Sequence, residues 1–385
     1  MPPMLWDIFC RVIDNFGDIG VCWRLSADLA ERGHHVRLWI DDTRALKWMA
    51  IPHPSIAVHD WEEAENHPPA PGDVVVESFG CDPPAAFVLG MHRSHPPTWI
   101  NLEYLSAEDY VERSHGLMSP VWSGAGAGLK KWFFYPGFTE QTGGLLRETS
   151  LALRQKAFLQ NTPSLHQWLA DVGVQTDPRI DHSRKLSVFC YATAPLPALL
   201  DELSKQLLAR DGASVTLLLT PGHATDLALR WKASLQQPEV RNLLGTRLHW
   251  VQLPLLTQPR FDEFLWLSDL NMVRGEDSAV RALWAHRPHV WQIYEQDDGV
   301  HAEKLHAFTD KWMKAWPQPT HHMALGAWDA WNNLAPTTQF AGLVESLLEP
   351  EKFAMWQEAS TRSHEKLANQ ADLTSQLLEF VSRSG

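Results

Sequence analysis

The stretch Ile-Asp-Asn-Phe-Gly-Asp-Ile-Gly at residues 13–20 decides the fold that we expect. The apolar run LWDIFCRV precedes it at residues 5–12, and a helical pattern follows it at residues 21–31. A strand, a tight polar turn and a helix in this order form the first unit of a doubly wound α/β fold. Because ligands in such folds bind at the carboxyl ends of the strands, the turn would place Asp14 and Asp18 at a ligand-binding edge.

Length and composition indicate a globular chain of two domains. The 385 residues exceed what one ordinary core accommodates, and 44% of them are hydrophobic. No signal-peptide pattern opens the chain and no apolar run is long enough to cross a bilayer, so a soluble protein is expected. The four cysteines form no CxxC pair, and we interpret them as buried thiols of a protein in the reducing cytoplasm.

The net charge of the chain indicates which kinds of partner it can bind. A formal net charge of −13 argues against a nucleic-acid-binding surface, which needs clustered Lys and Arg to neutralise phosphates. It favours a cationic partner, or a small ligand held by a few local donors. The 19 histidines are scattered without the spacing of metal ligands, so no metal site is predicted.

Strand and helix patterns alternate in both halves of the chain. In the first half, strands are expected at residues 35–40, 73–79 and 98–104, loops and short strands between residues 116 and 144, and helices near residues 151–160 and 164–171. In the second half, strands are expected at residues 186–191, 213–220, 247–253, 269–273 and 289–294, with helices between them and beyond residue 319.

This alternation predicts an α/β protein of GT-B type, in which two Rossmann-like domains face each other across a cleft. We assign residues 1–172 to the first domain, 173–184 to a polar linker, 185–350 to the second domain, and 351–385 to terminal helices that return to the first domain.

Two interpretations of Asp14 and Asp18 remain open. In the structural one, Asp18 caps the helix that follows and Asp14 bonds amides of the turn. In the functional one, the two carboxylates position and deprotonate a nucleophile, or hold a cation. A glycine beside them lets the backbone turn tightly next to a ligand.

A second candidate site follows the strand expected at residues 269–273. Arg-Gly-Glu-Asp-Ser at residues 274–278 again joins a strand to a helix. The helix N-terminus, the Ser278 hydroxyl and the Arg274 guanidinium are together suited to phosphate oxygens. Glu276 and Asp277 would instead meet sugar hydroxyls, capping amides or a cationic acceptor, because like charges repel at short range. The structural alternative is a capped helix with a salt-bridged arginine.

Aromatic side chains that could stack on a nucleobase are expected at the same edge. The candidates are Phe189, Tyr191 and Tyr294, and their alternative role is packing in the core. The chain has neither a GxGxxG motif after the first strand nor a phosphate-binding P-loop. The nucleotide is therefore expected in the second domain.

The two strand–turn–helix segments carry a resemblance to a known family. With IDNFGDIGVCWRL at residues 13–25 and RGEDS at residues 274–278, the chain resembles the EarP family, bacterial protein-arginine rhamnosyltransferases that modify translation elongation factor P. Further matching stretches are NLEYLSAEDYVE (101–112), FFYPGFTEQTGGL (133–145), FCYATAPLPALL (189–200) and IYEQDD (293–298).

The resemblance implies a metal-independent, inverting glycosyltransferase of the cytoplasm that needs no cofactor. It would transfer rhamnose from dTDP-β-L-rhamnose to an arginine in the N-terminal domain of elongation factor P, and thereby activate that factor. Its partners would be this protein and the donor sugar, with no nucleic acid and no membrane. The first domain would bind the acceptor, and the second would bind the nucleotide sugar.

The resemblance also assigns roles to residues. Asp14 and Asp18 match the two functional aspartates, Asp18 being the candidate general base, and Glu276 is the third catalytic candidate. The acceptor side would include Asn15, Phe16 and Gly17. The donor would contact Phe189, Tyr191, Gln258, Arg274, Asp277, Ser278 and Tyr294. The family pattern predicts an aromatic residue three positions before Gln258, where this chain has Leu255, so stacking on the base rests on Phe189 or Tyr191.

Two other functions remain open from the sequence. One is a non-catalytic GT-B module that binds a nucleotide sugar or a protein, because a fold does not fix a function. The other is a metal-independent glycosyltransferase with a different sugar or acceptor. The aspartate pair favours an enzyme over a binding module, which has no need of a base at that turn.

Overall fold

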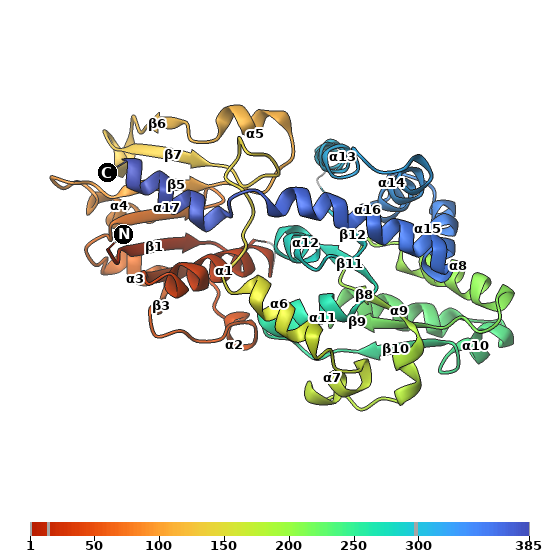
Figure 1. Cartoon of the computed structure of the whole chain (residues 1–385). Helices are drawn as coiled ribbons and strands as arrows, with labels where there is room; N and C mark the ends of the chain where they lie inside the picture. The colour runs from red at the N-terminus through yellow and green to blue at the C-terminus, as the bar shows by residue number, and fades with distance from the viewer. Residues whose placement is uncertain (1, 14–15, 296–298, 385) are drawn as a thin grey trace. The chain divides into compact units, whose positions relative to one another are not determined.

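The computed structural model describes residues 2–13, 16–295 and 299–384, and it contains two compact units (Figure 1). The N-terminal unit comprises residues 1–152 and 367–385, and the C-terminal unit comprises residues 153–366. Each unit is an α/β fold built on a parallel sheet. In the described part of the chain, no helix combines the length and the apolar character needed to cross a membrane.

The sheet of the N-terminal unit has seven strands in the order β3-β2-β1-β4-β5-β7-β6. The strands are β1 Leu5–Cys10, β2 His35–Ile40, β3 Ile56–Asp60, β4 Val74–Ser78, β5 Thr98–Leu102, β6 Met118–Pro120 and β7 Lys130–Phe134. The helices are α1 Gly17–Glu31, α2 Leu46–Met49, α3 Trp61–Asn66, α4 Ala85–Leu89, α5 Asp109–Ser114 and α17 Leu373–Ser384, with a 3-10 turn at Gly124–Gly126. Every strand pair is parallel except β6 with β7.

The direction of winding reverses in the middle of this sheet. The chain runs from β1 outward through β2 to β3, and then returns to place β4 on the other side of β1. The carboxyl ends of β1 and β4 therefore form the topological switch point, where α/β folds open a crevice for ligands.

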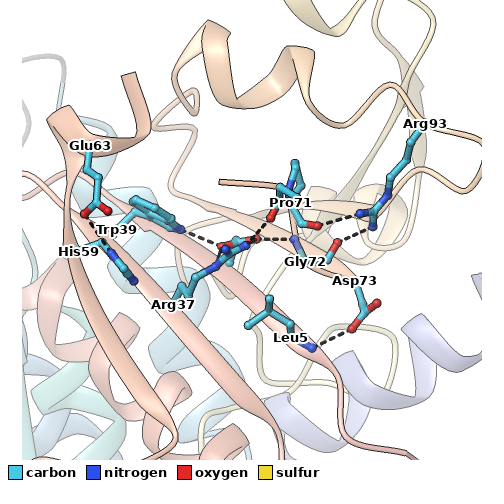
Figure 2. Close-up of polar contacts among 11 residues, drawn as sticks. Leu5, Arg37, Trp39, His59, Glu63, Pro71, Gly72, Asp73 and Arg93 are labelled. Atoms are coloured by element: carbon cyan, nitrogen blue, oxygen red, sulfur yellow. Dashed lines mark hydrogen bonds and ion pairs between the residues drawn. The ribbon is translucent and has the colours of Figure 1, made fainter. Parts of the chain in front are cut away.

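A buried carboxylate ties the strands of this sheet together. Asp7, fully buried in β1, accepts two hydrogen bonds of 2.7 Å from the Arg37 guanidinium of β2. It also accepts the indole N–H of Trp39 at 2.8 Å and the backbone N–H of Gly72 at 2.7 Å. Arg37, Trp39 and Gly72 thus converge on one side chain (Figure 2). A buried charge is tolerated because it is paired and fully hydrogen-bonded.

The C-terminal segment completes the core of the N-terminal unit. Helix α17, blue in Figure 1, contributes apolar side chains to the same cluster as the inner residues of β1 and α1, namely Leu373, Leu377, Leu378 and Val381. Arg32 at the end of α1 bonds Asp372 at 2.7 Å, directly before α17. The expectation that terminal residues return to the first domain thus corresponds to residues 367–385 in the structure.

The C-terminal unit repeats the same topology with five parallel strands in the order β10-β9-β8-β11-β12. The strands are β8 Arg184–Val188, β9 Val215–Leu219, β10 Leu248–Gln252, β11 Leu270–Arg274 and β12 His289–Gln292. The helices are α6 Leu151–Gln160, α7 Leu165–Asp171, α8 Leu196–Ala209, α9 His223–Ser234, α10 Pro238–Leu243, α11 Gln258–Leu267, α12 Gly275–Trp284, α13 Val300–Trp312, α14 Gln318–Trp331, α15 Phe340–Leu348 and α16 Pro350–Ala368, with 3-10 turns at Pro178–His182 and Thr337–Gln339. Its switch point lies between β8 and β11.

The structure divides the chain differently from the expected boundaries at residues 172, 184 and 350. The division falls at Ala152, because α7 packs within the C-terminal unit, where the Trp168 indole N–H bonds Glu263 at 2.9 Å. The expected linker at residues 173–184 contains a 3-10 turn with Ile180 buried. Residues 351–366 of α16 also belong to this unit, because the Trp316 indole bonds Ser363 at 2.7 Å. These contacts join residues far apart in the sequence.

The first residue of β12 is a buried histidine among tryptophans. The ring centroid of His289 lies 5.2 Å from that of Trp312 and 5.2 Å from that of Trp328. Burial lowers the pKa of His289 to about 4. The folded chain therefore keeps this imidazole neutral at pH values where the unfolded chain protonates it.

We expect His289 to make stability fall with acidity. As the pH falls from about 7 to about 5, the imidazole of residue 289 binds a proton in the unfolded state but not in the folded state. The free energy of unfolding therefore decreases by about 1–2 kcal/mol. Urea unfolding followed by tryptophan fluorescence at the two pH values measures this. The His289→Phe variant should lose that part of the pH dependence, and the same substitution at exposed His223 should not. An unchanged pH dependence in His289→Phe would contradict the assignment.

Candidate functional site

Asp18 lies inside the first turn of α1. The helix begins at Gly17, and the capping position is held by Phe16, whose side chain makes no capping bond. This corrects the expectation that Asp18 itself caps the helix. Asp18 is 3% exposed, and its Oδ2 accepts the backbone N–H of Ile13 at 2.8 Å. The carboxylate is thereby fixed at the carboxyl end of β1. Asp14 and Asn15 lie outside the described residues.

The turn that carries Asp18 is anchored on both sides. The Val12 backbone N–H bonds Oδ1 of Asp41, which follows β2, at 3.0 Å. The Phe16 ring packs edge-on against Trp48, with 5.1 Å between centroids. Phe16, expected on the acceptor side, therefore anchors the turn to the core, and Gly17 starts the helix. Such anchoring holds a catalytic group in one geometry before the substrate arrives.

The loop after β4 holds strained backbone at the same switch point. Phe79 and Asp82 have positive φ angles of 58° and 46°. Residues with a Cβ rarely adopt such angles, and clusters of them mark functional sites. The Gly80 N–H bonds the Asn101 side chain at 3.1 Å, and the Phe79 ring stacks on Tyr104 with 4.4 Å between centroids. These contacts hold the loop in its strained form.

A cavity of about 250 Å³ lies between the carboxyl ends of β1 and β4. Its lining comes from two segments, residues 11–13 and residues 78–82, and consists of Arg11, Ile13, Ser78, Phe79, Gly80, Cys81 and Asp82. Because Ile13 also bonds Asp18, the cavity adjoins the candidate base. Nearby, burial raises the pKa of Glu103, which follows β5.

Sequence reasoning missed the residues of this cavity and Glu103. The charge of Arg11 at the end of an apolar run, and the Phe-Gly pair after the β4 pattern, were the available signals. Neither signal indicates a cavity until the sheet order brings β1 beside β4. Within the described residues, no group of three or more His, Cys, Asp or Glu side chains is placed to hold a metal ion.

At the switch point of the C-terminal unit, residues 274–278 form the expected strand–turn–helix. Gly275 has a φ of 61°, which favours glycine at this position. The Ser278 hydroxyl accepts the backbone N–H of Arg274 at 3.1 Å and donates to the Arg274 carbonyl. Ser278, expected to bind phosphate directly, thus closes the turn at the N-terminus of α12.

The Arg274 guanidinium lies against two of the aromatic candidates. Its carbon is 4.6 Å from the ring centroid of Phe189 and 4.5 Å from that of Tyr191. The Tyr294 ring meets Tyr191 edge-on at 5.5 Å and is 57% exposed. The structure therefore brings together Arg274, Phe189, Tyr191 and Tyr294, as expected. Phe189 and Tyr191 thus both contact the cation of Arg274.

The other expected donor residues surround this group. Gln258 is the buried first residue of α11, and Phe261, in the same helix, contacts the Phe189 ring edge-on at 5.8 Å. Leu255 is 50% exposed. Glu276 forms an ion pair of 3.1 Å with Lys304 of α13. Asp277 lies beside it in the first turn of α12. Residues 296–298 of the IYEQDD stretch lie outside the described residues.

A buried ion pair holds α12 against α11. Arg281 donates from Nε and from a terminal nitrogen to the two oxygens of Asp262, both at 2.8 Å, and both residues are almost fully buried. Arg154 of α6 approaches the same carboxylate at 3.3 Å. Since Gln258 opens α11 and residues 275–278 open α12, this pair fixes the relative position of two segments that carry expected donor residues.

Comparison with known proteins identifies the family. The family described as "Elongation-Factor P (EF-P) rhamnosyltransferase EarP" matches residues 6–382. The chain belongs to the EarP family. It is 42% identical to the "Protein-arginine rhamnosyltransferase" of Pseudomonas putida over 347 residues, 85% of this chain and 86% of that relative. It is 37% identical to the protein of the same name from Pseudomonas aeruginosa, covering 98% of each.

Solved structures agree with this membership. The structure described as "Structural basis for EarP-mediated arginine glycosylation of translation elongation factor EF-P" matches with a TM-score of 0.66 and 29% identity, covering 99% of this chain and all of that one. "Spinosyn Rhamnosyltransferase SpnG" matches with a TM-score of 0.52 at 12% identity, covering 98% of this chain and 99% of that one, which supports the fold alone. The chain is thus a GT-B glycosyltransferase of the protein-arginine rhamnosyltransferase family.

We expect Asp262→Asn to destabilise the protein by about 3–5 kcal/mol, because it removes the charge of the carboxylate that pairs with the buried Arg281. Urea unfolding measures the change. The matched control is Glu358→Gln, which removes the carboxylate of an ion pair with Arg362 in which both side chains are 63% exposed, and little effect is expected. Equal effects of the two substitutions would contradict this role of the buried pair.

Proposed function

We propose that the chain transfers rhamnose from dTDP-β-L-rhamnose to an arginine side chain of translation elongation factor P, and thereby activates it. The observation that carries the proposal is a pair of switch-point sites of opposite character within a chain of the EarP family. The N-terminal unit presents the fixed carboxylate of Asp18, and the C-terminal unit presents the Arg274 guanidinium among aromatic rings. The description of the family and that of the related solved structure name the same acceptor.

The C-terminal site is suited to a nucleoside diphosphate sugar. The Phe189 and Tyr191 rings pack against the Arg274 guanidinium and orient it, and its N–H groups would bind phosphate oxygens. The N-terminus of α12 adds backbone N–H groups and a favourable dipole. Tyr294, with the most exposed of the three rings, offers a face for the thymine. Ser278 would act by shaping the turn that presents these groups.

The N-terminal site is suited to an arginine. A guanidinium is a poor nucleophile because its lone pairs are delocalised and its pKa exceeds 12. The carboxylate of Asp18 would hold the cation, orient one nitrogen and accept its proton as the new bond forms. Asp14, four residues earlier in the sequence, would be the second carboxylate of this site.

The reaction would be a single inverting displacement. An arginine nitrogen attacks the anomeric carbon of rhamnose, the bond from that carbon to the diphosphate oxygen breaks, and the electron pair leaves with dTDP. The nitrogen's proton passes to Asp18. Arg274 and the N-terminus of α12 stabilise the charge that develops on dTDP, so the transfer is proposed to be metal-independent. Glu276, in the first turn of α12 and paired with Lys304, would contact the sugar. A translation factor as acceptor implies a cytoplasmic enzyme.

Intact-mass spectrometry of elongation factor P, incubated with the enzyme and dTDP-rhamnose, tests the proposal. We expect an increase of one deoxyhexose, located on an arginine. Binding of the donor without any mass increase of elongation factor P would overturn the proposed activity. It would favour the alternative that the chain is a non-catalytic binding module.

The Asp18→Asn variant distinguishes the proposed role of Asp18 as the general base from its role in holding the turn. The amide oxygen of Asn still accepts the Ile13 N–H, but the base is lost, so transfer should fall by about 10²- to 10⁴-fold with dTDP affinity unchanged by calorimetry. The control is Asp73→Asn, because Asp73 likewise bonds a backbone N–H, that of Leu5 at 2.8 Å, but just before β4. Retained turnover in Asp18→Asn would show that Asp18 only braces the turn.

Arg274→Ala should weaken dTDP binding by roughly tenfold or more, because a charge-assisted contact to phosphate is lost. Calorimetry with dTDP measures the affinity, and Arg230→Ala on the exposed face of α9 serves as the control. Unchanged affinity in Arg274→Ala would remove this residue from the phosphate site.

A further inference from the structure

We propose that the cavity between β1 and β4 binds an acidic side chain of the acceptor protein, and that Arg11 pairs with its carboxylate. The inference rests on the proposed function, since it concerns how the acceptor is chosen. Arginine is common on protein surfaces, so an enzyme that modifies one arginine needs a second contact that other arginines lack.

The cavity lies where such a contact would be made. Arg11 and Ile13 line it from the end of β1, and the Ile13 N–H bonds the candidate base Asp18. At about 250 Å³ it has room for an amino-acid side chain. A residue close to the target arginine could therefore enter the cavity while the arginine itself meets Asp18.

Among the described residues, Arg11 forms no ion pair, and its positive charge contacts an aromatic ring instead. Its guanidinium carbon lies 4.6 Å from the ring centroid of Trp61, the buried first residue of α3. Elsewhere in the described part of the chain, no carboxylate lies within ion-pair distance of it. Because the ring contacts one face of the guanidinium, the N–H groups at its edge stay available for a bidentate bond to a carboxylate.

The other polar groups of the cavity are compatible with an acidic ligand. The Asp82 carboxylate, 89% exposed, approaches the Lys131 ammonium at 3.8 Å, and Lys131 also bonds Glu77 at 2.8 Å. Burial raises the pKa of the Cys81 thiol, so this group is neutral. The Ser78 hydroxyl accepts a hydrogen bond from Cys22 at 3.3 Å. Arg11 is thus the positively charged residue among those that line the cavity.

The backbone that carries Arg11 is positioned before any ligand binds. Asp41 bonds the Val12 N–H and Asp18 bonds the Ile13 N–H, so the residues after Arg11 are held from both sides. In a chain of formal net charge −13, such a pre-positioned cation offers an acidic segment a local attraction against an overall repulsion.

Steady-state kinetics of Arg11→Gln with elongation factor P and dTDP-rhamnose test the inference. We expect the KM for the acceptor to rise by roughly tenfold, with kcat and the KM for the donor unchanged. Arg11→Lys, which keeps the charge, should recover part of the loss. The control is Lys130→Gln, which removes an exposed positive charge at the start of β7 and should change nothing.

The partner carboxylate is found by replacing each Asp and Glu near the modified arginine of elongation factor P with the matching amide. One replacement should raise the acceptor KM as Arg11→Gln does, and should add no further loss in combination with it. The inference would be overturned if Arg11→Gln raised the KM for the donor or had no effect on the KM for the acceptor. It would also be overturned if the effect of Arg11→Gln on the acceptor KM were additive with that of every carboxylate replacement. Failure of the wild-type chain to transfer rhamnose would instead overturn the proposed function.

Discussion

Both units depend on one constraint, the reversal of winding in a parallel sheet. Parallel strands need crossover connections, and these are right-handed, so a change of direction sends successive helices to opposite faces of the sheet. At the reversal, the loops after two adjacent strands diverge, and no connection covers the gap between them. Asp18 and the Arg11 cavity occupy that position between β1 and β4, and Arg274 with its aromatic neighbours occupies it between β8 and β11. The fold supplies the place, and the local residues supply the chemistry.

The two sites hold charges by different physical means. Asp18 is almost fully buried, and the backbone N–H of Ile13 orients one of its carboxylate oxygens. Arg274 is fixed through the faces of its planar group. Arg11 on Trp61 repeats this second arrangement in the N-terminal unit. In all three cases the contact that orients the charge differs from the contact that would bind substrate, so rigidity is gained without blocking the reactive atoms.

Local patterns predicted the α/β class and most elements, because β1, β4 and α12 follow hydrophobic periodicity and turn chemistry. They failed for β3, whose apolar run of three residues is short and whose side chains are largely exposed. The boundary at Ala152 and the turn at Pro178–His182 depend on long-range packing, which composition does not encode. At the sites, residue types indicated where Asp18 and Arg274 would lie. The contact of Arg274 with Phe189 and Tyr191 depends on the pairing of β8 with β11, which the sequence does not reveal. The bonds of Asp18 to Ile13 and of Ser278 to Arg274 are local, and they depend on the exact backbone conformation of each turn.

The position of α17 has a consequence for the order in which the protein is made. The core of the N-terminal unit uses side chains from Leu373 to Val381, so its β-sheet lacks part of its apolar cover until this segment has been synthesised. The C-terminal unit is formed by residues 153–366 alone and can mature earlier. Although domains generally form in the order of synthesis, here the half synthesised first would be the last to close. Until then, the core against which Val12 and Phe16 of the β1 turn pack is incomplete.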